Sequence, residues 1–216
     1  MSGYQRWRRR AEKWFLSIVA VACNAMAAGG LTPNAVTVSG FLLSAAAGAC
    51  YARGWLLAAG LVVLFAGVCD AADGMLARRT GRESRFGAFL DSSLDRLGEI
   101  CLFCGLMWHF APISRAAALM CMLALTGSLM VSYTRARAEG LGVTCRVGWM
   151  QRPERMALLI AGSLAGALPA VGDVLMSGVL TALAVASYFS MIQRIVHVFS
   201  SLRGDARSSG RNSGSP

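Results

Sequence analysis

Predominantly apolar runs, each close to the length that crosses a bilayer, fill most of this 216-residue chain. A transmembrane helix needs about 20 such residues, because the hydrocarbon core of a bilayer is about 30 Å thick. Lipid offers no partner to backbone polar groups, so helices are the usual spanning structure. Candidate spans lie at 34–53, 55–77, 87–110, 113–134, 155–170 and 174–196. We therefore predict an all-α, polytopic membrane protein with six transmembrane helices.

The composition supports the same class of protein. Hydrophobic residues make up 56% of the chain and charged residues only 15%, against about 25% charged residues in soluble domains. Several of the candidate spans follow one another directly, which leaves no room for a second domain. We predict a single membrane domain over residues 1–202.

The two ends of the chain differ from the spans. Residues 4–28 combine a basic start with Trp7 and Trp14 and have no convincing small-residue cleavage site. We predict an amphipathic interfacial helix there, whose cations meet anionic head groups; a spanning signal anchor is the alternative. Residues 203–216 are polar and rich in Gly and Ser, which predicts a disordered cytoplasmic tail.

Four of the six aspartates lie within otherwise apolar segments: Asp70, Asp73, Asp91 and Asp95. An ionised side chain in a membrane span costs a few kcal/mol or more, so such residues usually face a cavity and mark function. The first two are three residues apart and the last two four apart, so each pair projects from one face of a helix. Two such faces opposed would form an all-oxygen site suited to magnesium, manganese or calcium.

The string DAADGMLARRTGRESRFGAFLDSSLD at residues 70–95 resembles the signature of the CDP-alcohol phosphotransferases, D-x2-D-G-x2-A-R-x8-G-x3-D-x3-D. The fixed positions of that signature are matched by Asp70, Asp73, Gly74, Ala77, Arg78, Gly87, Asp91 and Asp95. The resemblance implies a membrane enzyme that displaces CMP from CDP-diacylglycerol with an alcohol, using two Mg²⁺ or Mn²⁺ ions per site.

The resemblance also implies a role for individual residues. Asp70, Asp73 and Asp91 correspond to the principal metal ligands, and Asp95 corresponds to a residue that is both ligand and general base. The positions expected to contact the CDP-lipid are Pro33, Asn34, Ala35, Val36, Gly74, Arg78 and Ser84. Two alternatives stay open: the glycines of the motif could serve close helix packing, and Pro33 and Asn34 could be helix-start residues.

The placement of the basic residues predicts the topology. Of the 21 Lys and Arg, only Arg53 and Arg115 border the first–second and third–fourth connections, and the fifth–sixth connection has none. Cytoplasmic loops carry the excess of Lys and Arg in membrane proteins. We therefore expect a multi-pass protein of the inner or plasma membrane with both termini and the aspartate site in the cytoplasm.

Arginines at the cytoplasmic ends of the later spans predict the acceptor. These residues are Arg135, Arg152, Arg155 and Arg194. Any cytoplasmic loop attracts arginine, yet convergent arginines would also suit a phosphate on the acceptor. The strings SYTRARAE, RPER and QR resemble the branch of the family that transfers to inositol 1-phosphate, which implies this acceptor.

Other interpretations remain at this stage. Within the family, the acceptor could be glycerol 3-phosphate or an alcohol such as serine. Outside it, intramembrane aspartates could form the pathway of a cation transporter, although a pore has no need of Ala77 and Arg78. The expected partners are the lipid bilayer and a second copy of the chain, since family members are typically homodimers; no nucleic acid is expected.

Overall fold

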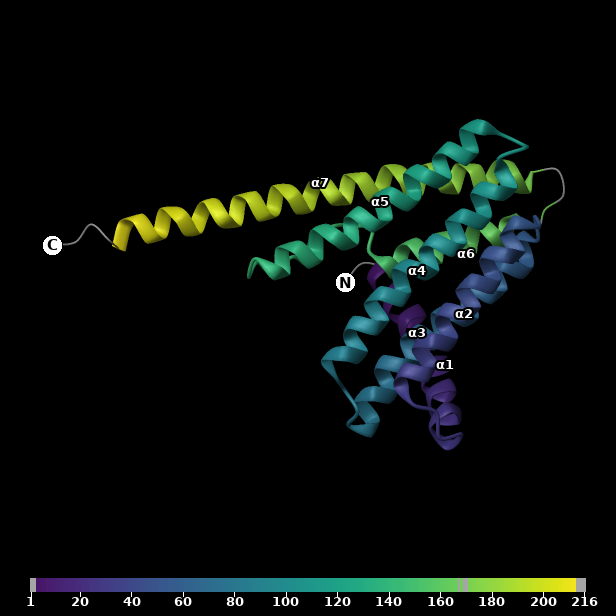
Figure 1. Cartoon of the computed structure of the whole chain (residues 1–216), viewed down its shortest axis with the longest axis horizontal. Coiled ribbons are helices and arrows are strands. Elements are labelled where there is room, and N and C mark those ends of the chain that lie inside the picture. The colour runs from purple at the N-terminus through teal and green to yellow at the C-terminus, as the bar shows by residue number, and fades with distance from the viewer. Residues whose placement is uncertain (1–2, 167, 169–170, 213–216) are drawn as a thin grey trace. The chain divides into compact units, whose positions relative to one another are not determined.

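The computed structural model describes the backbone of residues 3–166, 168 and 171–212, and side chains within 16–166, 168 and 171–203. Helices make up nearly all of this part of the chain (Figure 1), and no strand occurs in it. The helices are α1 (Gly3–Ala28), α2 (Pro33–Ala52), α3 (Leu56–Thr80), α4 (Arg85–Phe110), α5 (Arg115–Gly140), α6 (Arg152–Ala165) and α7 (Gly172–Asn212). The prediction of an all-α protein is confirmed.

Short polar residues start two of the helices, α2 and α4. The Thr32 hydroxyl accepts the N–H of Ala35 (3.3 Å) at the start of α2, and the Ser84 hydroxyl accepts the N–H of Gly87 (2.9 Å) at the start of α4. Each hydroxyl replaces the carbonyl partner that a first-turn amide lacks. α3 ends at Thr80 and is capped by Gly81, whose φ of 63° is left-handed and therefore favours glycine.

Among the residues that the structure describes, four helices are long and apolar enough to cross a membrane: α2, α3, α5 and residues 172–203 of α7. They correspond to the first, second, fourth and sixth predicted spans. α4 and α6 are not among these four. α4 carries charged side chains along its first half, and α6 has only 14 residues, which is about 21 Å of helix at 1.5 Å per residue. Large apolar side chains such as Phe65, Phe89 and Val185 are exposed on these helices, as expected where lipid is the solvent.

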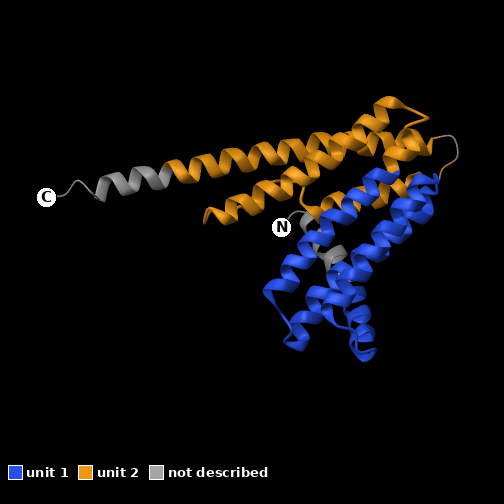
Figure 2. Ribbon diagram, viewed as in Figure 1, with its two compact units in different colours: residues 1–105 blue, residues 106–216 orange. Residues whose placement is uncertain are grey.

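The chain divides into two compact units, residues 1–105 and 106–216 (Figure 2). The single membrane domain over 1–202 stays a prediction. α7 extends to Asn212, past residue 203, where the sequence predicts that a disordered tail begins. α1 covers the predicted interfacial segment 4–28 as one helix, but the side chains of residues 4–15 lie outside the described residues.

In the first unit, α3 packs against both α1 and α2. The side chains between these helices form a buried apolar cluster of Val19, Cys23, Val36, Ala72 and Leu76. Arg79 of α3 donates to the side-chain oxygen of Asn24 in α1 at 2.5 Å. α2 and α4 approach at two glycines, because a Cβ on Gly105 would lie only 2.0 Å from the carbonyl oxygen of Gly48. This packing fixes the helix faces that carry the aspartates.

In the second unit, α7 packs against α5 and α6. His109 at the end of α4 meets Asp173 at the start of α7, with Nε2 and Oδ1 2.9 Å apart. Near the other end of α5, a small buried cluster of Ala138, Val143 and Cys145 holds the connection between α5 and α6. The arginines predicted to bind the acceptor lie around this connection.

Candidate active site

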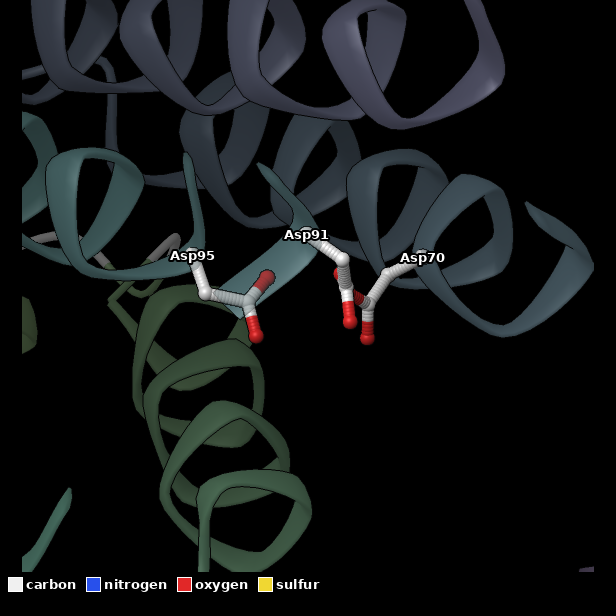
Figure 3. A group of neighbouring side chains, drawn as sticks. All are labelled: Asp70, Asp91 and Asp95. Carbon is white, nitrogen blue, oxygen red and sulfur yellow. The ribbon is translucent and has the colours of Figure 1, made fainter. Parts of the chain in front are cut away.

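Three of the four aspartates bring their carboxylates together. Asp70 projects from α3, and Asp91 and Asp95 project from α4 toward the same space (Figure 3). One carboxylate oxygen from each lies within 4.8 Å of the others, and all three residues are half-buried. Oxygen ligands lie about 2.0–2.6 Å from magnesium or calcium, so donors on opposite sides of one ion are about 4–5 Å apart. The cluster therefore fits a divalent cation.

Asp73 lies outside this three-carboxylate cluster. Its side chain is almost fully buried, with 6% exposure. Its Oδ2 lies 2.7 Å from the Thr37 hydroxyl, which is also 3.0 Å from the Pro33 carbonyl. A hydroxyl has one proton, and an ionised carboxylate is the stronger acceptor. Thr37 therefore orients Asp73, one helical turn beyond Asp70, at the wall of an adjoining cleft.

The cleft lies between the starts of α2 and α4 and the end of α3. Its lining residues are Pro33, Asn34, Thr37, Asp73, Gly74, Ala77, Arg78, Arg82, Glu83, Ser84, Gly87, Ala88 and Asp91. First-turn residues of two helices and two arginines thus surround one space. Helix N-termini carry a partial positive charge, and guanidinium groups pair with phosphate oxygens. The cleft can accordingly hold a polyanion such as a diphosphate beside the carboxylates.

Five of the seven residues predicted to contact the CDP-lipid line this cleft: Pro33, Asn34, Gly74, Arg78 and Ser84. The other two do not. Val36 is buried in the apolar cluster between the first three helices, because it lies two residues after Asn34, on the opposite side of α2. Ala35 contributes its amide to the cap of α2.

Gly87 has a steric role at the mouth of the cleft. A Cβ at this position would lie 3.0 Å from the Ser84 hydroxyl and 3.3 Å from Oδ1 of Asn34. Glycine therefore lets the first turn of α4 approach the first turn of α2. A Cβ on Gly74 would make only an ordinary contact with Arg78, at 3.5 Å, so space for a bound group remains the interpretation of that glycine.

Sequence reasoning did not single out Thr37 or Arg82. The signal for Thr37 was available, since it lies four residues after Pro33 and three after Asn34 and thus shares their helix face. Arg82 lies in the short loop after α3, and spacing alone does not place a loop side chain in a cleft.

The bond between Thr37 and Asp73 leads to a prediction about metal affinity. Replacing Thr37 with Val keeps the volume but removes the hydroxyl that orients Asp73. Loss of a group that orients a metal ligand typically weakens binding about 10–100-fold. We expect Thr37→Val to weaken Mn²⁺ binding at least about tenfold in an electron paramagnetic resonance titration of the purified protein, with Thr37→Ser close to wild type. Equal Mn²⁺ affinities for Thr37→Val and wild type would contradict the orienting role.

The arginines predicted to bind the acceptor have different surroundings. Arg155 and Arg194 are buried in the second unit, with 1% and 3% exposure. The charges of Arg135 and Arg155 both act on the guanidinium of Arg194. Arg135 is exposed and its Nε donates to Glu139 at 2.9 Å. Arg152 is half-buried at the first turn of α6. A bound anion would offset the repulsion that Arg135 and Arg155 exert on the buried guanidinium of Arg194, which agrees with an anion site.

Comparisons with known proteins agree with this geometry. The family model of the CDP-alcohol phosphatidyltransferases matches residues 30–195. The archaetidylinositol phosphate synthase of Methanothermobacter thermautotrophicus is 41% identical over 173 residues, which cover 80% of this chain and 86% of that protein.

Solved structures give the same result at the level of the fold. The phosphatidylinositol phosphate synthase of Mycobacterium tuberculosis with CDP-DAG bound has a TM-score of 0.77 at 33% identity, covering 85% of this chain and 94% of that one. Its complex with manganese and citrate has a TM-score of 0.77 at 34% identity, covering 84% and 88%. The chain is thus a membrane-bound transferase and belongs to the CDP-alcohol phosphatidyltransferase family.

Proposed function

We propose that this protein transfers the phosphatidyl group of CDP-diacylglycerol to inositol 1-phosphate and releases CMP. The observation that carries the proposal is the carboxylate cluster of Asp70, Asp91 and Asp95 beside a cleft lined by arginines and helix N-termini. The relatives support the choice of substrates, because those with 41% and 33% identity are named for inositol phosphate products and one was solved with CDP-DAG.

The proposed site holds two Mg²⁺ or Mn²⁺ ions through Asp70, Asp73, Asp91 and Asp95. Bound divalent ions would neutralise the diphosphate and help align the two substrates. The donor set supports this role, because all its ligand atoms are carboxylate oxygens, which hard cations prefer. A neighbouring protein of the same fold was solved with manganese.

The chain's own residues would bind and orient the CDP-lipid. Arg78 lies along the cleft wall one turn beyond Gly74, where it can donate to diphosphate oxygens. Ser84 and Asn34 border the mouth of the cleft, close to Gly87. These contacts would hold the phosphorus atom in line for attack.

Asp95 would accept the proton of the acceptor hydroxyl. It ends the carboxylate cluster on α4, one turn beyond Asp91, and its side chain keeps 15% exposure. Nη1 of Arg96 lies 3.9 Å from Oδ2 of Asp95 and also donates to the Ser92 carbonyl. A half-buried carboxylate in this position is close enough to solvent to pass the proton on.

The membrane arrangement completes the proposal. Six helices, α2 to α7, would cross or enter the membrane, with α1 lying at the interface. Both termini and the site would face the cytoplasm, as the distribution of Lys and Arg indicates. The protein would act as a homodimer, with the polar segment 203–216 as a cytoplasmic tail.

Acceptor competition tests the proposed function. The purified protein would receive CDP-diacylglycerol, Mg²⁺ and equal concentrations of inositol 1-phosphate, free inositol, glycerol 3-phosphate and serine. We expect it to form mainly the inositol phosphate lipid, as identified by mass spectrometry. Free inositol lacks the phosphate that the arginines would bind. A glycerol phosphate product would support the other acceptor within the family, and absence of any CMP release would remove the transferase proposal.

An arginine pair on α5 provides a matched test of the acceptor site. Arg135→Ala should raise the KM for inositol 1-phosphate about tenfold or more, because a charge-assisted contact contributes roughly 1.5–3 kcal/mol, and leave the KM for CDP-diacylglycerol unchanged. Arg137→Ala is the control, since Arg137 is also exposed and lies two residues away on another face of the helix. Equal effects of the two substitutions would mean that general positive charge, not a site, attracts the acceptor.

A further inference from the structure

The connection between α5 and α6 is tied along one face of α7. We call residues 143–150 the strap. The Met150 N–H donates to the Ser190 hydroxyl (3.0 Å), Nε of Arg194 donates to the Val147 carbonyl (2.9 Å), and Nε2 of His197 donates to the Thr144 carbonyl (3.2 Å). Ser190, Arg194 and His197 are spaced by four and three residues, so they share one face of α7. The strap runs antiparallel to the helix along this face.

The strap is packed as well as hydrogen-bonded. Val143 and Cys145 are buried while Thr144 and Arg146 are exposed, the alternation of an extended segment with one buried side. The buried side packs against Ala138 of α5 and Val198 of α7. Cys145 is fully buried, with 0% exposure, and is a free thiol. Its accessibility therefore reports whether the strap is docked.

Arg194 is held from two directions. Its Nε donates to the strap and its Nη1 donates to the Val131 carbonyl of α5. A guanidinium has five N–H donors in a rigid plane, so two fixed bonds set the direction of those that remain. Arg155 is tied to the strap as well, because its Nη1 lies 3.3 Å from the Met150 carbonyl.

Gly148 provides the space in which the Arg194 guanidinium lies. Its φ is 111°, in the region that favours glycine. A Cβ at this position would lie 3.2 Å from Nε and 3.6 Å from Nη2 of Arg194. An alanine here would strain the strap backbone and push the guanidinium away from its two carbonyl partners.

We propose that the strap is a positioning element for acceptor binding, with Gly148 and Ser190 as the residues that set the orientation of Arg194. The proposal rests on the proposed function, in which Arg155 and Arg194 bind the acceptor's phosphate. Two guanidinium groups fixed before the acceptor arrives lose less freedom when it binds. The strap thus contributes to affinity for a phosphorylated acceptor and contributes nothing to binding of the CDP-lipid.

The experiment measures steady-state kinetics of the full-length protein in detergent for Gly148→Ala and Ser190→Ala. The control is Ser200→Ala, the same kind of change on α7, at an exposed serine whose hydroxyl donates to the Val196 carbonyl of its own helix. We expect both strap variants to raise the KM for inositol 1-phosphate about tenfold, with the KM for CDP-diacylglycerol within about twofold of wild type. Ser200→Ala should match wild type in both.

A second readout follows the strap directly. Labelling of Cys145 by a water-soluble maleimide is quantified by peptide mass spectrometry. Cys145 should react faster in Gly148→Ala and Ser190→Ala than in wild type and Ser200→Ala. If Gly148→Ala fails to fold, Ser190→Ala decides both readouts.

The outcomes separate this proposal from the proposed function. An unchanged acceptor KM in Ser190→Ala, with faster Cys145 labelling, would make the strap structural only and overturn the proposal. Equal rises in both KM values would also overturn it, because the strap would then support the whole fold. If wild type itself prefers another acceptor, the proposed function fails, and the strap proposal fails with it.

Discussion

Asp91→Asn is expected to abolish CMP release. Asp91 belongs both to the three-carboxylate cluster and to the lining of the cleft, so it is the residue at which the metal site and the CDP-lipid site would meet. The amide keeps the shape of the side chain but removes a charged metal ligand. A metal that stabilises transition-state charge contributes several kcal/mol, so we expect a loss on the order of 10³-fold or more in kcat.

The matched control for this substitution is Asp173→Asn. Asp173 lies at the start of α7, paired with His109 at a partly exposed position, and an exposed ion pair contributes about 0–1 kcal/mol. CMP release by Asp173→Asn should stay near wild type. EDTA should abolish the activity of the wild-type protein, and added Mg²⁺ or Mn²⁺ should restore it. Full activity in EDTA, or in Asp91→Asn, would contradict a role of the cluster in metal binding.

Asp95→Asn should separate binding from turnover. If Asp95 acts as general base, the amide leaves CDP-lipid binding within a few fold while kcat falls about 10²–10⁴-fold. Asp95 does not line the cleft with Asp91, which is why the binding step should tolerate the change. The comparison requires two measurements on the same protein: binding of a CDP-lipid by isothermal titration and CMP release under saturating acceptor.

The alternative role for Asp95 gives a different pattern. Were it mainly a metal ligand, Asp95→Asn would weaken Mn²⁺ and CDP-lipid binding together with turnover, as expected for Asp91→Asn. Parallel losses of binding and turnover in Asp95→Asn would therefore contradict its assignment as the base.

The apolar pattern of the sequence was sufficient to predict most of the fold. The first span was predicted at 34–53, and α2 covers Pro33–Ala52. The start was predictable because Thr32 and Pro33 are local helix-start signals that the sequence shows directly. The fourth span was predicted to end at residue 134, whereas α5 continues to Gly140. The apolar run ends at the arginines of that segment, which is why the predicted span ends there. A helix can continue through arginines when it leaves the apolar region.

The sequence predicted one metal site formed by all four aspartates of the motif, and this assignment stays a prediction. The structure brings the carboxylates of three of them together. The burial of Asp73 against Thr37 was not predicted, since that bond joins two helices. The strap on α7 was not predicted either, because an extended segment that pairs with side chains of a helix has no periodic signature in the sequence.

The central claim is that one site couples a CDP-lipid to a phosphorylated alcohol, and the stoichiometry of the products tests it most directly. Purified protein in lipid nanodiscs would receive CDP-diacylglycerol, Mg²⁺ and inositol 1-phosphate, and CMP and the new lipid would be quantified in the same samples. We predict equal amounts of CMP and inositol phosphate lipid, with neither formed when the acceptor is omitted. CMP formed at the same rate without acceptor would identify a hydrolase, and that result would contradict the account.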